Sequence, residues 1–400
     1  MGKTEIDKKD FRKSLGQVNV NVWKQMNMSE RKFDFWTCGL AALTSFMMVG
    51  CGSKPLTMVV GTYTDDCASR GVYSYFFDQE KGVLVTGKGE DRFAEAPGAV
   101  GLAEIRNPSY LTLSADGRYV YAVREVADST ASAATLSLDR KTGAMQLIGN
   151  ELTDGKDPCY ISTNGKVVMT ANYSSGNVTE FPVGDDGALK PHDFLYRTGL
   201  GGPDSTRQNL PHAHCALFNA AGTELYVSEF SADVIARYDV VTRQCRRIQL
   251  PSDFGPRHIV LNDGEDKAYV IGELSGSIAV IDTESDRVVQ TVCADTINAR
   301  GSADIHFSPD GRFLYASNRL QNDGIAIFKV NADGTLAKIG YRNTGIHPRN
   351  FNITPNGKFL LVACRDSGCI QIFKRNVRTG LLSDTGRTIV LDKPVCIVFV

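Results

Sequence analysis

The chain has 400 residues and a formal net charge of −1 at pH 7, with 44 lysines and arginines against 45 aspartates and glutamates. This balance argues against a general role in binding nucleic acid or membrane surfaces. Hydrophobic residues make up 42% of the sequence, which is ordinary for a globular protein, and the length allows one large domain or several average ones.

The first fifty residues have the features of an export signal. A basic pair precedes a largely apolar run from Phe33 to Gly50, and Cys51 follows directly. A basic start, a short apolar core and a small residue before the cut are the parts of a secretory signal. The cysteine at that position resembles the lipidated cysteine of bacterial lipoproteins. We therefore expect an upstream extension plus signal peptide over 1–50 and a short linker over 51–56.

This interpretation places the protein in the periplasm or cell envelope, attached to a membrane only through a lipid on Cys51. An uncleaved membrane anchor is the alternative, and it gives nearly the same cellular side.

After residue 57, a short strand-turn-strand unit recurs. Glycine supplies the positive φ of a tight turn, and Asp or Asn tolerates the neighbouring left-handed position. The turn glycines are Gly117, Gly165, Gly222, Gly264, Gly311 and Gly357. The equivalent positions in the strands that follow are Tyr121, Met169, Tyr226, Tyr269, Tyr315 and Leu361, which are 48, 57, 43, 46 and 46 residues apart. A period in the forties with several strands per unit predicts a β-propeller.

The two ends of this region complement each other. Six turns give six blades of four antiparallel strands. Residues 394–400 match the first strand of a blade and then stop, whereas Met58–Thr62 match a second strand. We therefore predict an all-β fold, a seven-bladed β-propeller over residues 57–400, whose ring is closed by the C-terminal strand joining the N-terminal blade. Closure removes exposed sheet edges.

The ten cysteines do not have the spacing of a disulfide framework or a zinc site. Cys159, Cys215 and Cys396 lie early in apolar strands and are predicted to be buried, whereas Cys364 and Cys369 flank a turn across which they could meet. No dinucleotide-binding loop, P-loop or metal-ligand cluster is present, so we expect no cofactor and no metal. Core packing is predicted for Tyr121, Tyr226, Tyr269, Tyr315 and His306.

Six short segments occur in a fixed order, spaced by whole blades. They are VGTYT at Val60–Thr64, LPHAH at Leu210–His214, GPRH at Gly255–His258, GEL at Gly272–Leu274, SPDGRFLYASNR at Ser308–Arg319 and HPRNF at His347–Phe351. Together they resemble the seven-bladed lactonase propellers, the propeller-type 6-phosphogluconolactonase family, over about residues 57–400. That family is also similar to a fungal propeller that opens and closes carboxymuconate lactones.

Ionisable residues gather at one end of the predicted hairpins. The first and second strands of a hairpin are antiparallel, so residues before the first and after the second lie together, around one mouth of the central channel. Before or in the first strands are His212, His214, Arg257, His258, Asp304, Arg349 and Asn350. At the ends of the second strands are Arg124, Glu125, Asn172, Glu229, Glu273, Arg319, Arg365 and Asp366. The opposite end has the composition of ordinary solvent-exposed turns.

Lactone hydrolysis needs a base for water, donors for the oxyanion and a group that holds the base in its useful tautomer. Histidine suits the first task, with an ordinary pKa of about 6.5, and arginine suits the second. The resemblance implies that His214 (or His212) is the base and that Arg257 and Arg319 bind the carboxyl or phosphate and the developing oxyanion. Glu273 would orient a histidine or take a proton.

Further candidates for substrate contact are His212, His258, Arg349 and Asn350. Each of these groups also has a purely structural interpretation: a histidine bonded at a strand start, an Arg257–Glu273 ion pair, or a structural Arg319. The chain departs from the family's pattern at Gly272, where Asn is frequent, and at Glu229-Phe230-Ser231, where Asp-Leu-Gly is frequent. Both departures concern the substrate pocket more than the architecture.

These observations favour a hydrolase that opens a sugar (aldono)lactone and resembles 6-phosphogluconolactonase. Export favours an unphosphorylated lactone, because the phosphorylated one is a cytoplasmic metabolite. The expected partner is a small-molecule lactone and not nucleic acid. Two alternatives remain: a non-catalytic exported propeller that binds carbohydrate or protein, and a muconate-type lactonising isomerase. The sequence does not specify the oligomeric state.

Overall fold

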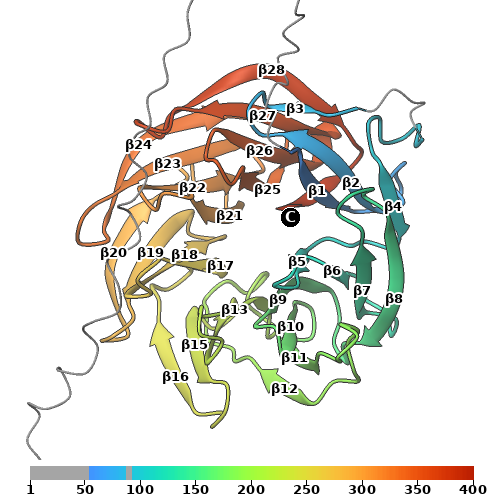
Figure 1. Ribbon diagram of the computed structural model, residues 1–400. Helices are drawn as coiled ribbons and strands as arrows, with labels where there is room; N and C mark the ends of the chain where they lie inside the picture. The colour runs from blue at the N-terminus through green and yellow to red at the C-terminus, as the bar shows by residue number, and fades with distance from the viewer. Residues whose placement is uncertain (1–53, 87–91) are drawn as a thin grey trace, which may run out of the picture. The chain divides into compact units, whose positions relative to one another are not determined.

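The computed structural model describes residues 54–86 and 92–400, which form seven antiparallel sheets arranged in a ring around a central axis (Figure 1). The predicted signal and Cys51 lie outside the described residues. Six of the sheets contain four consecutive strands each, and the seventh combines strands from both ends of the described chain. The predicted seven-bladed propeller is confirmed.

The strands of the first three blades are given from the innermost outward. The first consists of β29 (Pro394–Phe399), β1 (Leu56–Thr62), β2 (Gly71–Asp78), β3 (Val83–Leu84) and β4 (Gly101–Glu104). In this first blade, both of the last two strands pair with β2. The second consists of β5 (Leu111–Leu113), β6 (Tyr119–Arg124), β7 (Ser132–Leu138) and β8 (Met145–Leu152). The third consists of β9 (Pro158–Thr163), β10 (Val167–Asn172), β11 (Asn177–Pro182) and β12 (Phe194–Arg197).

The other four blades repeat this order. The fourth consists of β13 (Ala213–Phe218), β14 (Glu224–Glu229), β15 (Val234–Asp239) and β16 (Cys245–Gln249). The fifth consists of β17 (Pro256–Leu261), β18 (Lys267–Gly272), β19 (Ser277–Asp282) and β20 (Arg287–Cys293). The sixth consists of β21 (Ser302–Phe307), β22 (Phe313–Asn318), β23 (Gly324–Val330) and β24 (Leu336–Asn343). The seventh consists of β25 (Pro348–Ile353), β26 (Phe359–Cys364), the 3₁₀ turn η2 (Arg365–Ser367), β27 (Cys369–Arg375) and β28 (Leu382–Val390).

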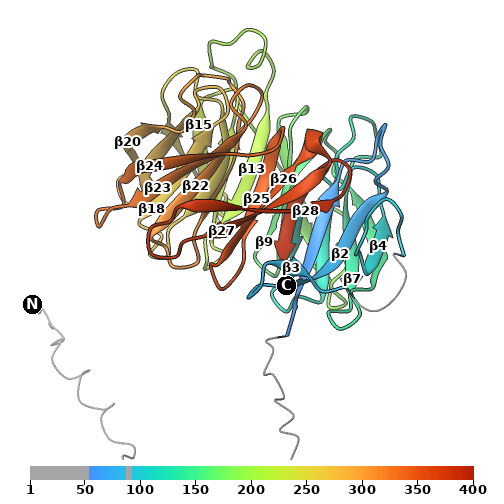
Figure 2. The same ribbon diagram turned by 90° about the horizontal axis from the view of Figure 1, so that it is seen from above.

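The ring has two ends, which we name by the hairpins around the axis. At the strand-start end, first strands begin and second strands finish. At the turn end, the two are joined by the recurring turn. The loop between β12 and β13, residues 198–212, projects from one face of the ring (Figure 2). It leads into the start of β13 and so belongs to the strand-start end.

Ring closure follows the predicted pairing. β29 pairs antiparallel with β1, with Met58 opposite Phe399 and Val60 opposite Ile397. The first blade departs from the simple four-strand pattern at its outer edge, because β3 pairs with the last two residues of β2 and β4 pairs with its first four. The pair Val83–Leu84 is too short to cover the outer edge of β2 by itself.

The recurring turns work in part differently from the prediction. Gly117 has a φ of 67°, as expected for a tight turn, but Asp116 is not left-handed; its carboxylate instead accepts the backbone N–H of Arg118 at 3.0 Å. In the fifth blade, Glu265 takes the left-handed conformation with a φ of 53°, whereas Gly264 does not. Asp and Asn therefore serve these turns through side-chain hydrogen bonds to the backbone.

Neighbouring blades are held together by tyrosines of the second strands. The hydroxyl of Tyr121 donates to the carbonyl of Gly187 in the next blade at 3.0 Å, and that of Tyr315 donates to the carbonyl of Gly380 at 2.7 Å. The predicted core role of these tyrosines is confirmed, since Tyr121, Tyr226, Tyr269 and Tyr315 are at most 2% exposed.

The cysteines described by the structure are all free thiols. Cys159, Cys215 and Cys396 are buried as predicted. Cys364 and Cys369 do face each other across the hairpin of the seventh blade, but they form no disulfide.

Candidate active site

Four of the predicted residues meet at the strand-start end. His214 and Arg257 are the second residues of β13 and β17, and Glu273 and Arg319 directly follow β18 and β22. Because every blade repeats the same hairpin, these positions from successive blades face the same region near the axis. All four side chains are less than a tenth exposed.

Glu273 is the centre of this group. Its Oε2 accepts from Arg257 Nε at 3.0 Å and lies 3.2 Å from an Nη of Arg319, while its Oε1 accepts from Arg207 at 2.7 Å. Burial raises the pKa of Glu273, but the charges of Arg319, Arg257 and Arg207 outweigh it and hold the pKa at about 2. Glu273 is therefore an anion that organises three guanidinium groups, which makes it a poor proton acceptor near neutral pH.

Arg319 is fixed by the backbone of its own blade and by a histidine of the next one. Its Nε donates to the carbonyl of Gly301 at 2.9 Å, and one Nη donates to His347 Nε2 at 3.3 Å. The other nitrogen of His347 lies 3.2 Å from Asp366, which defines a neutral tautomer. Burial lowers the pKa of Arg319 to about 9, despite the neighbouring Glu273, so the guanidinium remains charged at neutral pH.

His214 lies beside this cluster. Its Nδ1 is 3.6 Å from the Cys159 thiol, and its Nε2 is 3.9 Å from Glu273 Oε2, which is long for a direct hydrogen bond. Burial lowers the pKa of His214 well below the ordinary value, and the charge of Arg257 lowers it further. The imidazole is therefore neutral at pH 7, with a nitrogen available to accept a proton.

A fourth arginine, Arg349, is the second residue of β25 in the seventh blade. The Arg349 guanidinium lies 5.3 Å from the centre of the Tyr63 ring and 3.8 Å from Glu125. Burial lowers its pKa, but Tyr63 and Glu125 raise it more, so this arginine is also charged. Four guanidinium groups, those of Arg207, Arg257, Arg319 and Arg349, thus share the two carboxylates of Glu125 and Glu273. This excess positive charge suits an anionic ligand.

His258, Asp304 and Asn350 lie deeper along the axis. His258 Nδ1 donates to Asp304 at 2.7 Å, and its Nε2 accepts from Arg257 at 3.1 Å. Asn350 uses both ends of its amide, donating to Asp304 at 2.5 Å and accepting from the Ile397 backbone at 2.8 Å. Burial lowers the pKa of His258 to about 4. These residues support the arginine cluster from behind.

His212 lies against Tyr173 at the outer edge of the cluster. The two rings are stacked with centroids 4.1 Å apart, and Nδ1 of His212 is 2.8 Å from the Tyr173 carbonyl oxygen. Tyr173 also approaches Arg207, whose Nη is 3.4 Å from the tyrosine hydroxyl. His212 is half-buried, unlike His214.

Two members of the cluster were not predicted. His347 was visible as the first residue of the HPRNF segment, but nothing in the sequence pairs it with Arg319. Arg207 belongs to the loop 198–212, which has no strand periodicity, so no pattern places it near Glu273.

The two departures from the family's pattern also have structural explanations. At Gly272 a Cβ would lie 2.6 Å from the Phe254 carbonyl oxygen, so a larger residue does not fit there. Glu229 is fully buried and forms a two-point ion pair with Arg247, on its own blade.

His306 differs from its prediction as a core residue. Its side chain is 28% exposed and lines a cavity of about 530 Å³ at the turn end. In the described parts of the chain, no group of three His, Cys, Asp or Glu side chains is placed to hold a metal ion. The same residues contain no helix of the length and apolarity needed to span a membrane.

Comparison with known proteins identifies the family of this chain. A model described as "Lactonase, 7-bladed beta-propeller" matches residues 57–399. The chain belongs to the seven-bladed β-propeller lactonases. A 6-phosphogluconolactonase of Bacillus subtilis is 33% identical over 356 residues, which cover 85% of this chain and 97% of that protein.

Solved structures of other lactonase-like propellers are similar along most of their length. A putative 6-phosphogluconolactonase of Bacteroides uniformis is 48% identical, with a TM-score of 0.81, and covers 87% of this chain and 100% of its own. A periplasmic gluconolactonase of Pseudomonas aeruginosa is 29% identical, with a TM-score of 0.78, and covers 86% and 99%. This lactonase propeller is thus 6-phosphogluconolactonase-like.

Proposed function

We propose that this propeller hydrolyses a sugar lactone to the open-chain aldonate, using the arginine cluster and His214 at the strand-start end. The observation that carries the proposal is the neutral His214 beside guanidinium groups held by Glu273. A neutral imidazole can accept a proton from water, while fixed positive charges stabilise the oxyanion that forms on the lactone carbonyl.

The reaction takes three steps. His214 Nε2 accepts a proton from water as the water oxygen bonds to the carbonyl carbon. Arg257 and Arg319 stabilise the resulting oxyanion. The oxyanion then re-forms the carbonyl as the ring C–O bond breaks, and the leaving oxygen receives the proton from His214. The new carboxylic acid releases its own proton to solvent, which gives the aldonate carboxylate.

The remaining predicted residues have supporting roles in this proposal. Arg349 and His212 contact the substrate at the edge of the cluster, because their side chains lie beside Tyr63 and Tyr173 at that end. His258 and Asn350 do not contact the substrate directly but hold the cluster in position, since both are bonded to Asp304. The excess of arginines accepts either the product carboxylate or a 6-phosphate.

A lactone panel tests this function. The full chain is assayed with D-glucono-1,5-lactone, its 6-phosphate and a carboxymuconolactone, each corrected for spontaneous hydrolysis. Turnover of a gluconolactone supports the proposal, and preference for one form decides whether the substrate is phosphorylated. Turnover of the carboxymuconolactone alone would favour the lactonising isomerase. No turnover, with saccharide binding at the same cluster, would favour a binding protein.

The role of Arg319 has its own test in the same assay. Lysine cannot donate to Glu273, Gly301 and His347 at once, because an ammonium is a point charge and not a planar fork. Arg319→Lys is expected to lower kcat/KM by about 10²–10³-fold. Arg312→Lys, an exposed arginine paired with Asp310, is the control and should leave kcat/KM unchanged.

We further propose that the protein is exported and lipidated on Cys51. The apolar run before Cys51 supports this, and so does the similarity to a periplasmic protein of Pseudomonas aeruginosa. Metabolic labelling with a radioactive fatty acid should label the wild type and not Cys51→Ser. An unlabelled wild-type protein in the cytoplasm would contradict export and would favour the phosphorylated substrate.

A further inference from the structure

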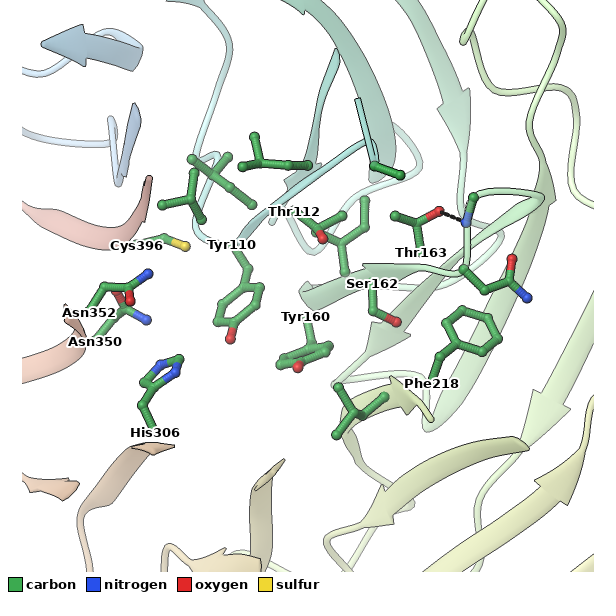
Figure 3. Close-up of a pocket in the computed structure, with 18 of the residues that line it drawn as sticks. Tyr110, Thr112, Tyr160, Ser162, Thr163, Phe218, His306, Asn350, Asn352 and Cys396 are labelled. Atoms are coloured by element: carbon green, nitrogen blue, oxygen red, sulfur yellow. Dashed lines mark hydrogen bonds between the residues drawn. The ribbon is translucent and has the colours of Figure 1, made fainter. Parts of the chain in front are cut away.

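A cavity of about 530 Å³ lies at the turn end. His258, Asp304 and Asn350, which lie deeper along the axis, separate it from the arginine cluster. Figure 3 shows Tyr110, Tyr160 and His306 directed toward the same space, with Phe218 and Asn352 at its sides. Turn residues such as Asn164 and Gly165 form its rim. Its volume is within the range of small-molecule sites in proteins, which is roughly 300–1,000 Å³.

Aromatic rings separate this cavity from the candidate active site. Tyr110 and Tyr160 stack with centroids 4.4 Å apart, and both rings meet His258 edge to face, at 5.3 and 5.2 Å. His258 in turn contacts Arg257. A ligand at the turn end would therefore touch the far side of this layer and not the arginines.

The cavity has a single source of charge. No Asp, Glu, Lys or Arg is among its described lining residues, and His306 is the lining residue that can be a cation near neutral pH. His306 Nε2 is 2.9 Å from Asp304 Oδ2, and its Nδ1 makes no hydrogen bond to any other described residue. That nitrogen is available as a donor to a ligand.

The environment of His306 favours its charged form. Burial lowers its pKa, but the carboxylate of Asp304 raises it more, and the net shift is upward. Asp304 also accepts from His258, which burial keeps neutral, and the Phe351 ring packs against His306 at 5.0 Å without adding charge. The imidazolium and Asp304 balance each other, so the cavity offers one charged donor and no surplus of charge.

Two other polar groups of the lining, the side chains of Ser162 and Asn352, are already bonded within the protein. Ser162 donates to the Ala216 carbonyl at 2.5 Å, and Asn352 donates to the Ile397 carbonyl at 2.9 Å. The remaining surface is largely aromatic and aliphatic, with Leu217 and Phe218 beside Tyr160. A matching ligand has one hydrogen-bonding anionic group and a body that packs against rings.

We propose that the turn-end cavity is a second ligand site, which binds a small monocarboxylate through His306 Nδ1 and packs its apolar body against Tyr160 and Phe218. A phosphate dianion fits less well, because the His306–Asp304 pair leaves no surplus of positive charge and offers one charged donor. The site is independent of lactone hydrolysis, which we assign to the other end.

Binding of benzoate, measured by calorimetry at pH 6, tests the proposal, with benzyl alcohol as the neutral analogue. Thr112→Trp places a large ring into the cavity, and Lys166→Trp adds the same ring to an exposed turn position outside it. We expect benzoate to bind the wild type and Lys166→Trp, and not Thr112→Trp, with lactone turnover unchanged in all three. Benzyl alcohol should bind at least about ten-fold more weakly.

His306→Gln keeps a similar volume and removes the charge, so it tests the same site even if Thr112→Trp does not fold. It should weaken benzoate binding at least about ten-fold. Wild-type affinity should fall as pH rises through the pKa of His306, because the cation is lost. No benzoate binding, equal binding of benzyl alcohol, or benzoate binding that both His306→Gln and Thr112→Trp retain would overturn the proposal.

Discussion

At the scale of single residues, Glu273 explains how several arginines can be buried together. Removing a charged group from water is costly unless it is paired and hydrogen-bonded. One carboxylate here contacts Arg207, Arg257 and Arg319, and its pKa of about 2 keeps it ionised over the whole physiological range. Burial, together with the charges of Arg257 and Arg349, lowers the pKa of His214, which therefore stays a neutral acceptor.

Replacing His214 tests its role as the base. His214→Ala should lower kcat by about 10²–10⁴-fold with little change in KM, because a general base acts mainly in the transition state. His192→Ala is the matched control, since His192 lies outside the cluster and its partner among the described residues is Asp154. Circular dichroism checks that both variants fold. Full activity of His214→Ala would assign the base to another residue, with His212 as the next candidate.

The lowered pKa of His214 predicts an unusual pH profile. The base must be neutral, and burial with Arg257 favours the neutral form, so activity should rise with pH through an ionisation below the ordinary 6.5. The rate above spontaneous hydrolysis should then be flat across neutral pH. An inflection at or above 6.5, in a protein that remains folded, would exclude His214 as the titrating base.

The residues of the site were predictable to different degrees. The repeat alone predicts that four of them lie close together, because each lies at the strand-start end of its blade. These four are His214, Arg257, Glu273 and Arg319. His347 and Arg207 could not be assigned in this way, because their contacts depend on how neighbouring blades and a long loop pack. The turn-end cavity was not foreseen, since its polar residues resemble ordinary turn residues and its one charged group, His306, alternates within a strand.

At the scale of elements, each blade is locked to the one before it through the turn between its third and fourth strands. In the seventh blade this turn contains Gly380, with a φ of 75°, whose carbonyl accepts from Tyr315 of the sixth blade. A Cβ on Gly380 would lie 2.4 Å from the Phe313 ring. The backbone at Gly380 therefore both forms the turn of its own blade and contacts the sixth blade.

Two glycines of the seventh blade distinguish the cost of a left-handed backbone from the cost of a steric contact with the neighbouring blade. Gly386 has a φ of 67°, and a Cβ at this position would have no other atom within 4 Å, so Gly386→Ala should cost only the left-handed strain of about 1–2 kcal/mol. Gly380→Ala should cost about 1–3 kcal/mol more, because the added methyl meets Phe313. Urea denaturation of both variants measures the difference. Equal losses of stability would mean that the blades shift apart easily.

Strand positions followed well from the sequence because they depend on local periodicity and turns. The exception is the first blade, where β3 and β4 divide the outer edge of β2. That division depends on where the chain returns to the sheet after residue 91, which no local pattern encodes.

At the scale of the whole molecule, stability depends on joining distant segments. β29 is the innermost strand of the first blade, and it packs between β1 and the first strands of both neighbouring blades. Without it the ring has a gap that exposes the edge of β1. Open edges of this kind pair with other chains.

Deleting residues 394–400 should therefore give an aggregated protein with no cooperative thermal transition. Solubility and calorimetry measure this. Adding a synthetic peptide with the sequence of residues 392–400 during refolding should restore part of the soluble protein. A soluble deletion variant that melts cooperatively would show that the other six blades are stable as an open ring.

The position of β29 also determines when the first blade can be completed during folding. Domains usually begin to fold while the chain is still being made, starting from its N-terminal part. Here β1 is among the earliest strands to emerge, yet its inner partner is the last of the described strands. The first blade must wait, incomplete, while the six others are produced. Contacts between such distant segments form slowly, so this interval is when the nascent protein depends most on chaperones.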